Sequence, residues 1–178
     1  MELLTEKGFV ATGLDEILRR VQVPKGSFYH YFDSKDAFGA ALIRSYSDFF
    51  QHKLDRFLLD EAMSPLDRLR AFMKDAEQGM ARFDFKRGCL IGNLGQEMGA
   101  LPEPFREQLM GVLNTWQGSV ARCLDEAKAA GQINKATDTR QAAYVFWTGW
   151  EGAVLRAKLE RRPTALRAFS SFFLSSLN

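Results

Sequence analysis

Apolar residues recur at intervals of three and four along almost the whole chain, which is the period of an amphipathic α-helix. The pattern is plainest between residues 104 and 130. The apolar stripe of that segment consists of Phe105, Leu109, Leu113, Trp116, Val120, Cys123 and Ala127. The strict alternation typical of β-strands is almost absent. The sequence therefore predicts an all-α fold.

We expect about nine helices, with bounds set by capping residues, glycines and prolines. They cover approximately residues 2–7, 14–21, 25–31, 35–59, 65–85, 89–98, 104–130, 139–160 and 163–177. Ser34 and Ser64 are the expected N-caps of the fourth and fifth helices, and Pro65 suits a first helical position. Residues 1–46 are expected to form a small domain and residues 47–178 a larger helical one.

Composition and charge narrow the class of protein. The hydrophobic fraction of 46% supports a substantial core, and the net charge of +2 indicates no partner by itself. No apolar run is long enough to cross a membrane, and the N-terminal residues lack the pattern of a secretory signal. The two cysteines, Cys89 and Cys123, have no CxxC partner, so we expect no metal, no disulfide framework and a cytoplasmic location. No cofactor is expected.

Residues 14–32 follow the plan of a helix-turn-helix, with two short helices joined by a tight turn. The inward face of the second helix consists of Phe28 and Phe32, four residues apart. The side chains left pointing outward are Lys25, Ser27, Tyr29 and Tyr31. These are donors of the kind that reach base edges and phosphates in DNA. The alternative from residue types alone is that the tyrosines pack on a neighbouring helix.

The segment "GFVATGLDEILRRVQVPKGSFYHYFDSKDAF" resembles the DNA-binding signature of the TetR/AcrR family of bacterial repressors. The matching positions are Gly8, Phe9, Thr12, Ile17, Val23, Gly26, Ser27, Tyr29, Phe32, Ser34 and Lys35. The resemblance implies a helix-turn-helix domain followed by a ligand-binding and dimerisation domain. It also implies a homodimer bound to a palindromic double-stranded DNA operator. The residues implied to face base edges are Lys25, Gly26, Ser27 and Tyr29, and those implied to hold phosphates are Thr12, Tyr31 and Lys35.

Two features depart from the family pattern. Gly13 replaces a small polar residue, and the first helix is short, which leaves open whether residues precede Met1 in the native chain. Residues 1–46 also carry no net charge, because six basic residues balance six acidic ones. The basic residues are Lys7, Arg19, Arg20, Lys25, Lys35 and Arg44, and the acidic residues are Glu2, Glu6, Asp15, Glu16, Asp33 and Asp36. A DNA-binding domain must neutralise phosphates, so if the chain is complete we expect weakened affinity for DNA.

The last two helices are the expected dimer interface. The residues assigned to it are Val145, Thr148, Gly149, Gly152, Leu155, Phe169, Phe172 and Phe173. The glycines indicate that two backbones approach closely, since glycine within a helix costs about 1 kcal/mol relative to alanine. The apolar arc of the last helix is wider than a surface helix requires. The alternative is that these side chains are buried within one subunit.

A second set of residues indicates a small-molecule site in the helical body, where aromatic and polar groups are mixed. The candidates are Cys89, Asn93, Gln96, Trp116, Tyr144, Trp147, Trp150, Glu151 and Lys158. Taken singly, each tryptophan is as well explained by core packing, and Glu151 by solvation.

Cys89 stands at a helix start after Arg87, a position that favours the thiolate. The segment "GCLIGNLGQEMG" resembles an acrylate-responsive, electrophile-sensing branch of the same family. That resemblance implies an effector that is a small carboxylate or an electrophile. The carboxylate would be held by Lys158 or Arg156, or the ligand would add covalently to Cys89. The alternative for Cys89 is a small buried apolar residue, which is the expected role of Cys123.

Other classes of function fit less well. His30 and His52 lack the partners of a catalytic arrangement, so we do not expect an enzyme. The remaining alternatives are a regulator switched by covalent or oxidative modification of Cys89, and a helical interaction protein that has lost DNA binding. The sequence leaves open the operator, the effector and the sign of regulation.

Overall fold

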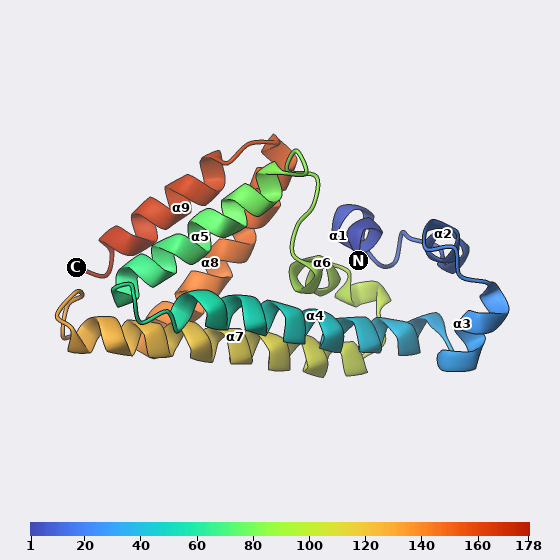
Figure 1. The fold of residues 1–178 in the computed structure, drawn as a ribbon, viewed down its shortest axis with the longest axis horizontal. Helices are drawn as coiled ribbons and strands as arrows, with labels where there is room; N and C mark the ends of the chain where they lie inside the picture. The colour runs from blue at the N-terminus through green and yellow to red at the C-terminus, as the bar shows by residue number, and fades with distance from the viewer. The chain divides into compact units, whose positions relative to one another are not determined.

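The computed structural model describes residues 1–178 and contains helices without any strand, which confirms the predicted all-α fold. The α-helices are α1 (Glu2–Lys7), α2 (Leu14–Arg20), α3 (Lys25–Tyr31), α4 (Lys35–Leu58), α5 (Pro65–Ala81), α6 (Leu90–Gln96), α7 (Pro104–Ala129), α8 (Thr139–Glu160) and α9 (Thr164–Ser175). A short 3-10 helix, η1 (Met98–Ala100), follows α6 (Figure 1). Their order matches the nine helices expected from the sequence.

The ends of the helices follow local chemistry. The Ser34 hydroxyl accepts a hydrogen bond from the amide of Ala37 at 3.0 Å and so caps α4 as expected. At the start of α8, the Asp138 carboxylate accepts hydrogen bonds from two backbone amides. Helix α5 ends four residues earlier than expected. Asp84 and Phe85 adopt φ angles of 52° and 54°, in the left-handed region where an α-helix cannot continue.

The chain divides into two compact units. The first unit consists of residues 1–48 and 89–112, and the second unit of residues 49–88 and 113–178. The first unit therefore includes α6, η1 and the start of α7 in addition to the helix-turn-helix. Sequence reasoning expected a boundary near residue 46 and did not expect residues 89–112 to pack with the N-terminal helices.

The core of the first unit forms where α4 passes two aromatic side chains. The rings of Phe9 and Phe105 lie 6.0 Å apart between centroids, and both are almost fully buried. A Cβ at Gly39 would come within 2.7 Å of the Phe9 ring and 2.8 Å of the Phe105 ring. Glycine at this position in α4 therefore lets both rings pack against the helix backbone.

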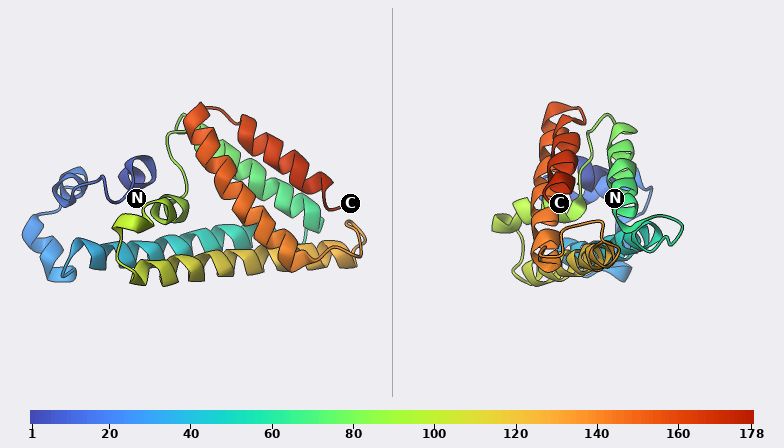
Figure 2. Two further views of the ribbon diagram at one scale, coloured as in Figure 1. Left: turned by 180° about the vertical axis from the view of Figure 1, so that it is seen from behind. Right: turned by 90° about the vertical axis from the view of Figure 1, so that its left-hand side faces the viewer.

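The second unit is built around a cluster of aromatic rings. Its members are Phe50, Phe72, Trp116, Phe146, Trp147, Trp150, Phe169 and Phe173. They come from helices α4, α5, α7, α8 and α9, and Figures 1 and 2 show α5, α8 and α9 packed side by side. Burying such large apolar side chains contributes about 1.5–3 kcal/mol each, so this cluster is the main source of stability in the second unit.

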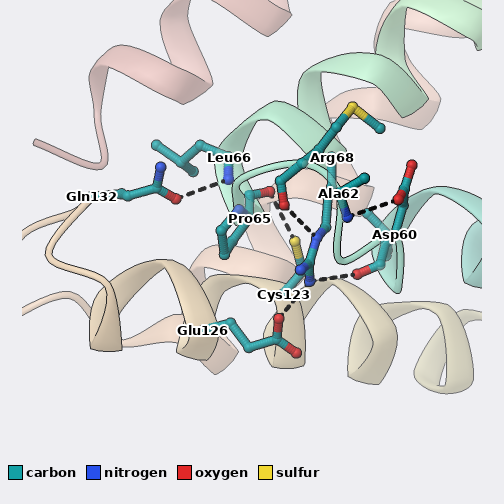
Figure 3. Close-up of polar contacts among 10 residues, drawn as sticks. Asp60, Ala62, Pro65, Leu66, Arg68, Cys123, Glu126 and Gln132 are labelled. Atoms are coloured by element: carbon teal, nitrogen blue, oxygen red, sulfur yellow. Dashed lines mark hydrogen bonds and ion pairs between the residues drawn. The ribbon is translucent and has the colours of Figure 1, made fainter.

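The buried side chain of Arg68 connects the start of α5 to α4 and α7 through polar contacts (Figure 3). The side chain of Arg68 is 8% exposed, and its guanidinium donates to the carbonyls of Leu58 at 3.3 Å and Met63 at 3.0 Å. It also forms an ion pair with Glu126 of α7 at 2.5 Å. The Cys123 thiol donates to the carbonyl of Pro65 at 3.2 Å. The two bonds from Arg68 pair the carbonyls at the end of α4 and in the loop that follows it, which burial would otherwise leave unpaired.

None of the helices combines the length and the apolar character needed to cross a bilayer.

Candidate functional site

Helix α3 presents the outward side chains that the sequence analysis assigned to DNA. Phe28 is 5% exposed and anchors α3 to the core of the first unit. Tyr29 and Tyr31 are 51% and 77% exposed, and Ser27 is also exposed. Helices α2 and α3 form the two arms of the helix-turn-helix and precede the long α4 (Figure 1). The hydroxyl groups of α3 are therefore displayed to solvent by a helix with one buried anchor.

Two cations of the helix-turn-helix, Lys25 and Arg20, are engaged in exposed ion pairs. The Lys25 ammonium lies 3.0 Å from the carboxylate of Asp15 in α2. The hydrogen bond and the charge of Asp15 raise the pKa of Lys25 above its ordinary value. Arg20 lies 3.7 Å from Glu2. These pairs agree with the absence of net charge in residues 1–46, and a phosphate would have to compete with Asp15 for Lys25.

Thr12 and Lys35 both form hydrogen bonds to backbone carbonyls of this chain. Thr12 is fully buried, and its hydroxyl donates to the carbonyl of Gly8 at 2.6 Å. The ammonium of Lys35 donates to the carbonyl of Phe9 at 2.7 Å and lies 4.5 Å from the centroid of its ring. The expected phosphate contact by the Thr12 hydroxyl is not available in this conformation, because the hydroxyl shapes the turn after α1.

Part of the expected dimer set forms an exposed apolar face on α8 and α9. The exposed fractions are 46% for Val145, 39% for Leu155 and 71% for Phe172, and Thr148 and Gly152 are exposed as well. Val145 and Gly152 are seven residues apart on α8, so they lie on the same side of the helix. This face remains the candidate for contact with a second copy.

The other three residues of the dimer set, Gly149, Phe169 and Phe173, pack within the chain. Phe173 is 2% exposed, with its ring centroid 5.1 Å from that of Phe146. A Cβ at Gly149 would overlap the ring of Phe169. Gly149 therefore allows α8 and α9 of one subunit to approach, which is the alternative that the sequence analysis left open. Phe169 itself is half-buried in this contact.

The three tryptophans expected to line a ligand site lie together in the aromatic cluster of the second unit. Trp116, Trp147 and Trp150 are 0%, 4% and 3% exposed, and the ring centroids of Trp116 and Trp147 are 5.1 Å apart. The buried indole nitrogen of Trp147 has no hydrogen-bond acceptor. A buried donor left unpaired costs about 1–3 kcal/mol, so the Trp147 N–H is a ready donor for a bound molecule.

The remaining ligand candidates divide between the two units. Tyr144 is 56% exposed and shares the outer side of α8 with the apolar face. Glu151 and Lys158 of α8 are half-buried. In the first unit, Gln96 is exposed, so the structure does not place it among buried groups.

Cys89 is half-buried and stands at the N-cap of α6, with φ −76° and ψ 133°. Cys123 has a different environment. It is 2% exposed, and burial raises the pKa of its thiol to about 12. Of the two thiols, only that of Cys89 is partly exposed to solvent.

Asn93 and Glu97 have roles that sequence reasoning did not identify. The Asn93 amide donates to the carbonyls of Leu4 and Thr5, and the Glu97 carboxylate accepts the amide of Phe9 at 2.9 Å. Asn93 is thus bound to α1 instead of being presented to a ligand. These partners are separated by 88 residues or more in the chain, so no local sequence pattern could have signalled the contacts.

A helix-turn-helix joined to a larger helical body defines a DNA-binding transcriptional regulator, and the comparisons with known proteins agree. Residues 1–42 match the family described as "Bacterial regulatory proteins, tetR family". Residues 65–173 match the "Tetracyclin repressor-like, C-terminal domain". The chain belongs to the TetR family of transcriptional regulators and is not an enzyme.

Individual relatives cover nearly the whole chain. The chain is 55% identical to the transcriptional regulator AcuR of Cereibacter sphaeroides over 97% of this chain and 79% of that protein. It is 31% identical to the repressor NemR of Escherichia coli, over 90% of this chain and 80% of NemR. Among solved structures, regulatory protein TetR from Rhodobacter sphaeroides has a TM-score of 0.96 at 55% identity, over 98% of this chain and 92% of that one. The reduced form of E. coli NemR has a TM-score of 0.84 at 28% identity, over 97% of this chain and 89% of that one.

Proposed function

We propose that this regulator is a cytoplasmic repressor that binds a palindromic double-stranded DNA operator as a homodimer. A small carboxylate or an electrophile of the acrylate type would release it. The observation that carries the proposal is the solvent exposure of Ser27, Tyr29 and Tyr31 on α3, a helix that the buried Phe28 anchors. Hydroxyl donors on such a helix reach base edges and phosphates when the helix enters the major groove.

The test of DNA binding is a mobility-shift titration with double-stranded DNA from upstream of the protein's own gene. Tyr29→Phe removes one hydroxyl and is expected to weaken binding by about 5-fold to 10-fold per half-site. Lys25→Met removes one phosphate cation and is expected to lower the slope of log affinity against log salt by about one. Thr137→Val removes a hydroxyl from the loop between α7 and α8, outside the candidate sites, and serves as the control. Absence of any shift with the unsubstituted protein favours a helical interaction protein instead.

A single helix-turn-helix contacts few bases, and a two-fold dimer places two copies on successive half-sites. The exposed apolar face of α8 and α9 supports a second copy of the chain as its occupant, because contiguous apolar residues on a surface mark interaction sites. Phe172→Glu is expected to yield a monomer in light-scattering measurements and to weaken operator binding. Leu59→Glu alters a residue that is 55% exposed outside this face, and this variant should remain dimeric.

The effector proposal rests on the tryptophan cluster of the second unit and on Lys158. The Trp147 N–H lacks an acceptor, and an acceptor oxygen on a bound ligand would pair with it. Lys158 is a half-buried cation of the type that binds a carboxylate. Trp147→Phe keeps the aromatic ring and removes the N–H. Acrylate should therefore raise the melting temperature of Trp147→Phe less than that of the unsubstituted protein.

The covalent alternative uses Cys89. Its thiolate sulfur would bond to the β-carbon of acrylate while the electron pair of the C=C bond takes up a proton from water at the α-carbon. The solved structure of E. coli NemR is that of its reduced form, which supports a redox-sensitive switch among relatives. Mass spectrometry after exposure to acrylate should find one adduct, absent from Cys89→Ser. A full operator response by Cys89→Ser leaves only the reversible mode.

A further inference from the structure

A groove with a volume of about 570 Å³ lies in the second unit, along α7 and the first turn of α8. Its volume falls within the range of about 300–1,000 Å³ that is typical of small-molecule sites. None of the residues assigned above to DNA, to the dimer interface or to the effector lines it. The lining side chains that matter here are Asn114, Gln117, Gly118, Arg122 and Asp125 of α7 and Arg140 of α8.

The groove is separate from the tryptophan cluster of the same unit. Trp116 is fully buried, and its ring centroid lies 5.1 Å from that of Trp147. Gly118 follows Trp116 by two positions, a rotation of about 200° around the helix, so it lies on the opposite side of α7. Gly118, Arg122 and Asp125 are spaced three or four positions apart and share that side. A molecule in the groove therefore does not occupy the proposed effector site.

Hydrogen bonds hold the two helices that form the groove. The Thr139 hydroxyl donates to the carboxylate of Asp125 at 2.5 Å and so joins the start of α8 to α7. The backbone amide of Arg140 donates to the Asp138 carboxylate at 3.0 Å, within the N-cap of α8. The backbone that carries the Arg140 side chain is therefore fixed beside α7 (Figures 1 and 2).

The two arginines of the groove are exposed and lack carboxylate partners. Neither Arg122 nor Arg140 forms an ion pair, although Asp125 lines the same groove. The Arg122 guanidinium donates a single hydrogen bond, to the Ser119 hydroxyl at 3.4 Å. By contrast, the exposed Arg156 of α8 pairs with a carboxylate at 2.7 Å. A guanidinium has five N–H donors, so most donors of this pair of arginines remain available.

Two guanidiniums from different helices suit a phosphate group better than a single carboxylate. A carboxylate has two oxygens, which one guanidinium can bind in bidentate fashion. A phosphate group has three terminal oxygens and up to two charges, so both guanidiniums can bind it together. The amides of Asn114 and Gln117 supply donors and acceptors for a polar group attached to the phosphate. Nothing in the chain lies within 4 Å of a Cβ at Gly118, so the space beside α7 is open there.

We propose that the groove of α7 and α8 binds a small phosphate ester of nucleotide size, with Arg122 and Arg140 on the phosphate. A phosphate group alone fills only part of a groove of about 570 Å³, and the remainder accommodates the uncharged part of the ligand. The proposal goes beyond the proposed function, because it uses no residue of the operator or effector sites.

The test is isothermal titration calorimetry of the unsubstituted protein with adenosine monophosphate (AMP), in a phosphate-free buffer of low salt. We expect AMP to bind with a dissociation constant below about 1 mM and to bind more weakly as salt is added. Adenosine, which lacks the phosphate, should not bind, and inorganic phosphate should bind more weakly than AMP. Absence of AMP binding, or equal binding of adenosine and AMP, overturns the proposal. Equal binding of inorganic phosphate and AMP contradicts a ligand of nucleotide size.

Substitutions of the arginines test which groups hold the phosphate. Arg122→Gln and Arg140→Gln should each weaken AMP binding by about 10-fold, since each removes one charge-assisted contact. Arg44→Gln is the matched control, because Arg44 of α4 is also exposed and forms no ion pair. Trp147→Phe should bind AMP as the unsubstituted protein does, so a failure of the effector proposal would leave this result intact. Unchanged AMP affinity in both groove variants refutes the assignment.

A steric variant tests whether AMP lies in the groove. A side chain at Gly118 extends into open space, and replacing a helical glycine raises helix propensity. Gly118→Leu should therefore abolish AMP binding without lowering the melting temperature. Gly111→Leu is the control, because Gly111 lies two turns earlier on α7, outside the groove, and a Cβ there also meets nothing within 4 Å. AMP binding to Gly118→Leu with unchanged affinity would place the ligand elsewhere and overturn the proposal.

Discussion

Two glycines of α8 give a direct test of how α8 and α9 pack. A Cβ at Gly149 would overlap the Phe169 ring, and the next ring atoms would lie 2.9 Å and 3.0 Å away. Nothing in the chain lies within 4 Å of a Cβ at Gly152. Both positions are in the same helix, so the helix-propensity gain from alanine is the same, about 1 kcal/mol. The difference between the two variants therefore isolates the packing of Phe169.

Overpacking a core contact costs about 1–3 kcal/mol. Gly149→Ala should therefore be neutral or destabilising by up to about 2 kcal/mol, and Gly152→Ala should be stabilising by about 1 kcal/mol within the subunit. For a chain of this length, 1 kcal/mol corresponds to about 2–4 °C in melting temperature. Urea denaturation followed by far-UV circular dichroism measures the difference directly.

Stability measured at several protein concentrations distinguishes packing within one subunit from packing between two subunits. The loss in Gly149→Ala arises inside one chain, so it should be the same at all concentrations. If a partner helix lies over Gly152 in a dimer, Gly152→Ala should raise the dissociation constant of the dimer, and its apparent stability should fall as subunits separate. Equal free energies of unfolding for the two variants would refute the assignment of Gly149 to the contact with Phe169.

Three further predictions concern the interior. Arg68→Met should lower the free energy of unfolding by about 3 kcal/mol, since it leaves two carbonyls unpaired. Arg70→Met, which removes an exposed ion pair, should cost less than about 1 kcal/mol, and equal losses would contradict the role of the buried guanidinium. At pH 8, Ellman's reagent should titrate Cys89 alone in the folded protein and Cys123 only after unfolding. The raised pKa of the Cys123 thiol also means that its contribution to stability is complete below the unfolded-state pKa and declines as pH rises toward about 12, which alkaline unfolding curves can follow. Gly39→Ala should destabilise the first unit by about 1–3 kcal/mol, because the new methyl group meets two phenyl rings, and a more stable variant would exclude that contact.

The candidate DNA interface was largely predictable from the sequence because its signals are local. A helix-turn-helix is specified by residues within about 20 positions, and the buried Phe28 between exposed neighbours follows from the helical period alone. The partners of Thr12 and Lys35 were less predictable. Their hydrogen bonds to backbone carbonyls depend on how the turn after α1 closes.

The sequence by itself determined the helices, the cap at Ser34 and the exposed donors of α3, because periodicity and capping act over a few residues. The tertiary structure decided which of two similar glycines in α8 is covered, because only the position of Phe169 distinguishes them. It also decided that α6 packs with the N-terminal helices through Glu97. That contact joins residues 88 positions apart, and its hydrogen bonds form only once the fold brings a carboxylate to the backbone amides of the turn.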